Sequence, residues 1–250
     1  MRAADEGLGN VMGLFGFSKI CIHVADTSSF EILGKAEEVL MDFAHKIEII
    51  GSSDDIIGEP CKTLSVMSEN SDRSMALRSM VRNAGLGIED FTYDGEELLS
   101  CSKGMTMPSA LWDSSGARRF EALAGYIVES FYSDKILVVD SLDAGLDSKL
   151  ERAIVAAFNS DANEGSQLIF TLHDLSLMDD RKLFRKDQIW FLARTEERTC
   201  LYPLSALPAG DYSSSLRDRY IRGELGPIPS PDFMETLSLI AANRKTSFQG

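Results

Sequence analysis

The chain has 250 residues, of which 44% are hydrophobic and 26% are charged, and its formal net charge is −14 at pH 7. This composition is ordinary for a globular protein with one large α/β domain or two small ones. Binding to nucleic acid needs clustered Lys and Arg to neutralise phosphates, so the charge disfavours direct nucleic-acid binding. No run of about 18 apolar residues occurs, and residues 1–10 contain two acids and a single basic residue, the wrong polarity for a secretory signal. The sequence therefore predicts a cytoplasmic protein with no membrane span.

The four cysteines are widely spaced, at positions 21, 61, 101 and 200, and none belongs to a Cys-x-x-Cys pair. Such spacing argues against a zinc site or a disulfide framework. We therefore expect free thiols in a reducing compartment.

The first 110 residues are rich in Ser, Gly, Asp and Glu, and their apolar positions are scattered. Helical spacing of apolar residues predicts one helix over Phe30–Phe43 and another over Ser74–Ala84, with Gly85 as the C-cap. An extended segment, Gly87–Tyr93, then leads to Asp94-Gly95, a dipeptide typical of a hairpin turn.

The second part alternates strongly apolar runs with polar helices. Arg118–Tyr132 has a helical apolar stripe, and Lys135–Asp140 is a continuous apolar run that ends in an acid, as in a buried parallel strand. An amphipathic helix over Ser148–Phe158 separates this strand from a second buried strand, Gln167–His173. Strand, helix and strand in this order predict a right-handed βαβ unit.

The C-terminal part contains a further pair of strands. Gln188–Ala193 and Thr199–Leu204 flank the charged segment 194–198, which predicts an antiparallel hairpin at the edge of the sheet. A last helix is predicted over Asp232–Ala242.

Three segments contain the candidate functional residues, and their order along the chain is part of the argument. The first, Asp113–Gly116, stands directly before a predicted helix, where a Ser, a Gly and the helix dipole favour an anion. Taken alone, this segment is simply an N-cap. The second places Asp140 at the carboxyl end of a buried strand, where nucleotide-binding α/β proteins hold magnesium. The third delivers His173 to the same edge. Each feature has a structural explanation by itself, and their order favours a functional one.

These segments resemble a known family, the ABC-type ATPases of the SMC-like and OLD-like group, close to bacterial abortive-infection ATP-binding proteins. Asp113–Ala117 is similar to the family's signature loop, Val139–Asp147 to its Walker B strand and D-loop, and Gln167–Asp174 to its switch-histidine strand. Arg185–Phe191 and Tyr220–Pro229 also resemble family segments.

The resemblance is strongest over residues 110–230, and it implies the fold. We expect an α/β fold like that of ABC ATPases and other P-loop NTPases, with a parallel sheet, flanking helices, an edge β-hairpin and a truncated N-terminal lobe. Residues 1–110 would form a shortened α+β region, and residues 111–250 the C-terminal half of an ABC head.

The resemblance also implies roles for individual residues. Asp140 would hold Mg²⁺ and act with His173 as the catalytic pair. ATP would be contacted by the signature and D-loop residues, which are Ser114, Ser115, Gly116, Asp143 and Asp147.

Two departures from the family pattern bear on hydrolysis. Ser141 occupies the position of the glutamate that activates the attacking water, and a serine is no base at neutral pH. In addition, the segment closest to a Walker A loop, Gly13–Lys19, has Ser18 for the second glycine and is followed by Ile20 where a magnesium-binding hydroxyl is needed. We interpret this match as one that arises by chance.

We therefore predict a degenerate ABC-ATPase-like subunit that does not hydrolyse ATP alone and acts as an interaction or regulatory module. ABC heads pair head to tail, so the partner would be a second copy or a Walker A-bearing protein, and family analogy alone points to a phage-defence or toxin-like system. One alternative is an active ATPase after assembly with such a partner. Another is a metal-dependent nuclease that uses Asp140, Asp143 and Asp147 with His173.

Overall fold

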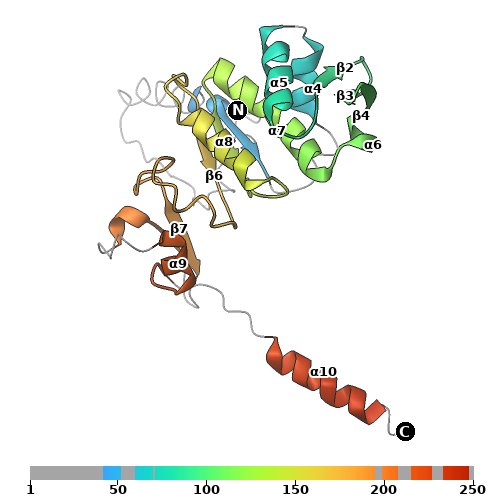
Figure 1. Cartoon of the computed structure of the whole chain (residues 1–250). Coiled ribbons are helices and arrows are strands. Elements are labelled where there is room, and N and C mark those ends of the chain that lie inside the picture. Colours follow the sequence, from blue (N-terminus) through green and yellow to red (C-terminus); the bar gives the residue numbers. More distant parts are fainter. Residues whose placement is uncertain are drawn as a thin grey trace, which may run out of the picture. The chain divides into compact units, whose positions relative to one another are not determined.

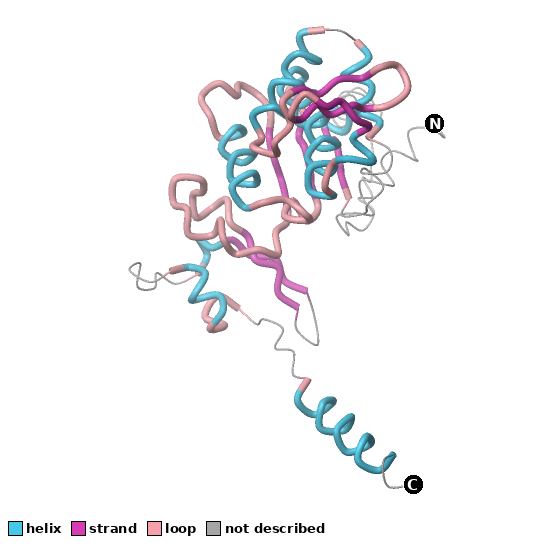
Figure 2. The backbone as a smooth tube through the Cα atoms, turned by 45° about the vertical axis from the view of Figure 1, so that its right-hand side comes forward, coloured by secondary structure: helices cyan, strands magenta, loops and turns pink. Residues whose placement is uncertain are grey.

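A computed structural model of the chain forms two compact units, which divide between Asp174 and Leu175. Figure 1 labels the elements of both units, and Figure 2 separates their helices, strands and loops. The structure describes residues 42–51, 60–69, 71–194, 199–207, 215–226 and 233–247.

A parallel sheet of three strands, flanked by helices, organises the first unit. Its strands are β1 (Ile47–Ile50), β5 (Ile136–Val139) and β6 (Gln167–Phe170), in the order β1-β5-β6. The predicted βαβ unit is confirmed, because β5 and β6 pair in parallel and a helix connects them. Strand β1 was not predicted, since Glu48 interrupts its short apolar run.

Two helices pack beside this sheet, α7 (Ser115–Ser133) and α8 (Ser148–Phe158). Both were predicted, and α7 extends beyond its predicted range at each end. The rings of Phe131 and Phe158 lie 4.7 Å apart between their centroids, so the two helices meet at their C-terminal ends. Asp134 ends α7 in the left-handed conformation, with φ 47°.

Helices α4 (Cys61–Ser68) and α5 (Asp72–Asn83) pack on α7. The buried Thr63 hydroxyl donates to the carbonyl of Glu121 at 2.7 Å, and a Cβ at Gly125 would lie 2.6 Å from Thr63 Cα, so only glycine fits at this crossing. This packing joins residues on both sides of position 110 into one compact unit, so the observed unit boundary differs from the predicted domain division.

An antiparallel sheet lies next to these helices in sequence and in space. It consists of β2 (Asp90–Tyr93), β3 (Leu98–Ser102) and β4 (Met105–Pro108), in that order, and α6 (Ser109–Trp112) follows it. The hairpin expected at Asp94-Gly95 is confirmed, with Gly95 at φ 107° in the turn between β2 and β3.

The second unit is built on a hairpin of β7 (Trp190–Arg194) and β8 (Thr199–Pro203), which confirms the predicted strand pair. The hairpin was expected at the edge of the parallel sheet. Among the described residues it instead forms a two-stranded sheet of its own, because its inner face packs on a separate core. That core contains Phe191, Leu204 and Leu225.

The described residues of this unit also form the 3-10 turn η1 (Leu204–Ala206) and the helices α9 (Leu216–Ile221) and α10 (Met234–Ser247), the last of which was predicted over Asp232–Ala242. The predicted helix over Phe30–Phe43 and the segment Gly13–Lys19 lie outside the described residues, apart from the last two positions of that helix. In the parts of the chain that the structure describes, no helix is long and apolar enough to cross a membrane.

Candidate functional site

The candidate site lies at the carboxyl ends of β5 and β6, where Asp140 and Thr171 meet. The Thr171 hydroxyl donates a hydrogen bond to Asp140 Oδ1 at 2.6 Å and accepts one from the Ser141 amide at 2.7 Å. The Asp140 amide itself donates to the carbonyl of Ile50 at 2.8 Å. These bonds hold the exposed Asp140 carboxylate at the tip of the sheet, where it is open to solvent and to a cation.

Ser141 is held in a conformation that a serine rarely adopts. Its φ is 54°, in the left-handed region, which costs roughly 1–2 kcal/mol for a residue with a Cβ. Its hydroxyl lies 3.5 Å from His173 Nε2, and its carbonyl accepts a hydrogen bond from the Arg119 guanidinium at 3.1 Å. His173 therefore lies beside the residue that follows Asp140, at the edge of the sheet to which the sequence assigned it. Strained backbone of this kind is common at functional sites.

Asp143 fixes the backbone that carries His173. Its Oδ2 accepts hydrogen bonds from the amides of His173 at 2.8 Å and Asp174 at 2.7 Å. One carboxylate oxygen thus sets the turn after β6. Contact of Asp143 with ATP stays a prediction, and the bonds described here already give this side chain a structural role.

Asp147 caps helix α8. Its Oδ1 accepts a hydrogen bond from the Lys149 amide at 2.9 Å, and the exposed carboxylate stands at the positive end of the helix dipole. This bond makes Asp147 an N-cap whatever else the residue contacts.

The signature-like segment begins α7, and the structure brings it to the turn after β5. A Cβ at Gly116 would lie 2.4 Å from the carbonyl oxygen of Gly145, so the first turn of α7 touches that turn directly. The Ser114 hydroxyl accepts from the Ala117 amide at 3.2 Å, which confirms the N-cap interpretation. Ser114 and Ser115 are both exposed.

A buried carboxyl group lies behind this segment. Glu121 is only 2% exposed, and burial raises its pKa from 4.5 to about 8, with the neighbouring Asp113 raising it further. Ser109 donates a short hydrogen bond to Glu121 Oε2, and Ser100 donates one to Asp113 Oδ2. Around neutral pH Glu121 is therefore mostly protonated. The hydrogen bonds of Glu121 and Asp113 connect the start of α7 to α6 and β3.

Glu151 is a second buried acid, on the first turns of α8. It is 1% exposed, and burial raises its pKa to about 7, followed by the charges of Asp143, Asp174 and Asp147. Glu151 Oε2 and Asp143 Oδ1 are both buried and have no hydrogen-bond partner. The negative charge of the nearby Asp143 is thus one cause of the raised pKa of Glu151.

The sequence interpretation missed four residues of this arrangement: Thr171, Arg119, Glu121 and Glu151. Two of them carried a signal, because Glu121 and Glu151 stand on the apolar stripes of their helices and a buried acid on such a stripe calls for an explanation. The partners of Thr171 and Arg119 are distant in sequence, so spacing does not reveal them.

The predicted aspartates are not arranged as a set of metal ligands. Among the residues that the structure describes, no group of three or more His, Cys, Asp and Glu side chains is arranged to hold a metal ion. Asp143 and Asp147 face a peptide backbone and a helix start respectively. The described geometry therefore gives the metal-dependent nuclease alternative no support, and it leaves Asp140 as the carboxylate free to meet a cation bound to a ligand.

No protein-family model matches the chain, and no curated protein matches it either. Among solved structures, the chain is similar to the crystal structure of the SmcHead bound to the C-winged helix domain of ScpA, with 14% identity and a TM-score of 0.48. That match covers 68% of this chain and 60% of the other chain. This chain thus spans less than two thirds of that relative. Because a similarity at this level says nothing about function, the roles of the site residues depend on the geometry described above.

Replacing Thr171 by Val should destabilise the protein. The change removes two hydrogen bonds, one from the Ser141 amide and one to Asp140, and each such bond has a net value of about 0.5–1.5 kcal/mol. Urea unfolding should show this decrease in the free energy of unfolding, and Thr171→Ser, which keeps the hydroxyl, should stay close to the parent. Equal stability of the Val and Ser variants would contradict the described bonding.

The buried Glu121 predicts a pH dependence of stability. Its pKa rises from 4.5 to about 8 on folding, so the folded state binds more protons between those values. The free energy of unfolding should then be highest below pH 4.5, with respect to this group, and should decrease as pH rises towards 8. Glu121→Gln should flatten this slope in urea unfolding series from pH 5 to about 8. Glu96→Gln, on the exposed turn after β2, is the control, and an unchanged slope in the Glu121 variant would refute the assignment.

Proposed function

We propose that the chain is an ABC-ATPase-like subunit that does not hydrolyse ATP alone and that presents its signature-like helix start to a nucleotide held by a partner. The observation that carries the proposal is the contact of α7 with the turn after β5. Ser114 and Ser115 are exposed at the N-terminus of a helix of 19 residues, beside the Asp140 edge of the sheet. Such a terminus favours an anionic ligand such as a phosphate.

The support for a subunit inactive on its own comes from Ser141. The residue after Asp140 has a hydroxyl that lies 3.5 Å from His173 Nε2, and it has no carboxylate that could activate water. Asp143 is a poor substitute, because its Oδ2 already accepts two backbone hydrogen bonds.

The support for a partner comes from the surface next to the signature-like segment. Leu111 is 80% exposed and Trp112 is 48% exposed. Both belong to α6, which ends just before Asp113. Met105 and Met107 of the edge strand β4 are exposed as well. Clustered aromatic, Met and Leu side chains on a surface are typical of protein interaction sites. In the proposed assembly they lie at the rim of the nucleotide site, against a second copy or a Walker A-bearing protein.

An active ATPase within such an assembly is the second candidate. The observation in its favour is the solvent-exposed Asp140, whose Oδ1 is oriented by Thr171 in the way expected for a carboxylate that holds Mg²⁺ bound to a nucleotide. On this alternative the partner supplies the phosphate-binding loop and the water-activating base. Both candidates agree with the predicted cytoplasmic location, where ATP and reduced thiols are found together.

Ser114→Arg tests the proposed contribution in trans. In an ATP-hydrolysing assembly purified through this chain, the long cation should block the helix start and lower turnover by at least about tenfold, equivalent to 1.4 kcal/mol of transition-state stabilisation. The chain should stay folded by circular dichroism. Ser65→Arg, at an exposed position of α4, is the matched control and should leave turnover unchanged. Full turnover in the Ser114 variant would rule out the contribution of this segment.

A further inference from the structure

A pocket of about 330 Å³ lies at the C-terminal ends of α7 and α8. Both helices begin at the Asp140 edge of the sheet, and α7 alone is about 28 Å long at 1.5 Å per residue, so the pocket is remote from the candidate site. It is lined by Phe131, Asp134, Ala157, Ser160, Ala162, Asn163 and Glu164.

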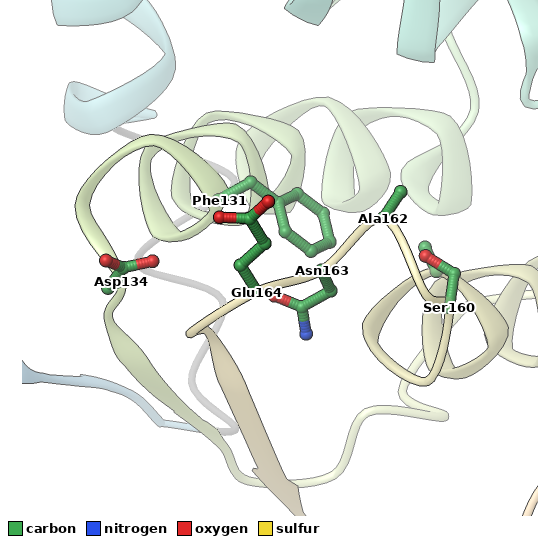
Figure 3. Close-up of a pocket in the computed structure, with 7 residues that line it drawn as sticks. Phe131, Asp134, Ser160, Ala162, Asn163 and Glu164 are labelled. Atoms are coloured by element: carbon green, nitrogen blue, oxygen red, sulfur yellow. The ribbon is translucent and has the colours of Figure 1, made fainter.

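The floor of the pocket is aromatic. Figure 3 shows the Phe131 ring in the middle, with Asp134 and Glu164 towards one side and Ser160 towards the other. The ring packs against Phe158, with 4.7 Å between the centroids, so it is held in place from behind. An aromatic ring fixed in this way offers a flat, electron-rich surface to a ligand.

The rim of the pocket is pre-organised by hydrogen bonds. The Asn163 side chain donates to the carbonyls of Phe158 at 2.7 Å and Ser166 at 2.8 Å, and it accepts from the Ser166 amide at 3.0 Å. The Ser166 hydroxyl donates to the carbonyl of Ser130 at 2.8 Å, which ties the loop to α7. These bonds support the conformation of the loop after α8 without a ligand, and such pre-organisation lowers the entropy cost of binding.

The acidic side of the pocket is also set by the backbone. A Cβ at position 165 would lie 2.4 Å from Asp134 Oδ1, so the glycine there lets the Asp134 carboxylate lie against the loop. Asp134 and Glu164 are both exposed, and neither forms an ion pair with another residue in the described parts of the chain. Two carboxylates beside a fixed ring are therefore available to a cation.

We propose that this pocket binds an arginine side chain presented by a protein partner. A guanidinium group is planar, so it stacks on the Phe131 ring while its N–H groups donate to Asp134 and Glu164. A lysine ammonium lacks the flat face and the fork of donors, and a neutral side chain lacks the charge. The charge of −14 also attracts basic partners to the chain as a whole. This docking point is independent of the nucleotide proposal, because it stands at the other end of α7.

The test is an NMR titration of the full chain with N-acetyl-arginine amide. We expect saturable shifts of the amides of Phe131, Asp134 and Glu164, with a dissociation constant of about 1–10 mM for this isolated side chain. N-acetyl-citrulline amide has nearly the same shape without the charge and should give no saturable shift. N-acetyl-lysine amide should bind more weakly than the arginine probe.

Matched variants decide which groups hold the probe. Glu164→Gln and Asp134→Asn should each weaken binding at least about threefold, and Asn keeps the left-handed backbone at position 134 favourable. Asp161→Asn, on the same loop but outside the pocket lining, should leave binding unchanged. The proposal is overturned by equal binding of citrulline or lysine, by shifts that lie elsewhere, by variants that bind like the parent, or by no saturation up to about 50 mM.

Discussion

The parallel pairing of β5 with β6 is the constraint on which the candidate site depends. Because both strands run in the same direction, their carboxyl ends emerge side by side, and residues about thirty positions apart meet there. Asp140 comes within hydrogen-bonding distance of Thr171, and Ser141 approaches His173. The crossover through α8 begins at this edge, so the N-cap of that helix lies near the site.

The bonds at this edge separate residues that hold the site together from residues that remain open to a ligand. Asp143 and Asp147 bind backbone amides, and Arg119 binds the Ser141 carbonyl. Asp140, Ser114 and Ser115 remain exposed. The site thus has a carboxylate open to a cation and a helix start open to an anion, and Ser141, which follows Asp140, has no carboxylate of its own. The proposed function, a subunit that contributes to a nucleotide site without completing one, depends on this combination.

Most of the first unit was predictable where local patterns are strong. The bounds of α8 follow from its apolar stripe, and β5 and β6 follow from continuous apolar runs that are too short for helices. The Asp94-Gly95 turn specified the hairpin between β2 and β3. Strand β1 was not predicted because Glu48 interrupts its apolar run. The β7–β8 hairpin was assigned to the wrong sheet because the pattern of a strand does not specify which sheet it joins.

The sequence predicted several residues of the candidate site, but it did not predict the hydrogen bonds between them. Order along the chain placed Asp140 and His173 at one edge, since parallel strands share an end. The role of Asp143 depends on an amide pair thirty residues away, and the contact between Gly116 and Gly145 depends on how closely α7 approaches a turn. An apolar stripe shows which face of a helix packs, and it does not specify how closely that face approaches a particular turn.

The most direct measurement of the central claim is ATP turnover by the purified chain alone with Mg²⁺. The account predicts no turnover above the rate in buffer and no change on Asp140→Ala, because no carboxylate stands after Asp140 to activate water. Magnesium-dependent turnover that Asp140→Ala abolishes would contradict it.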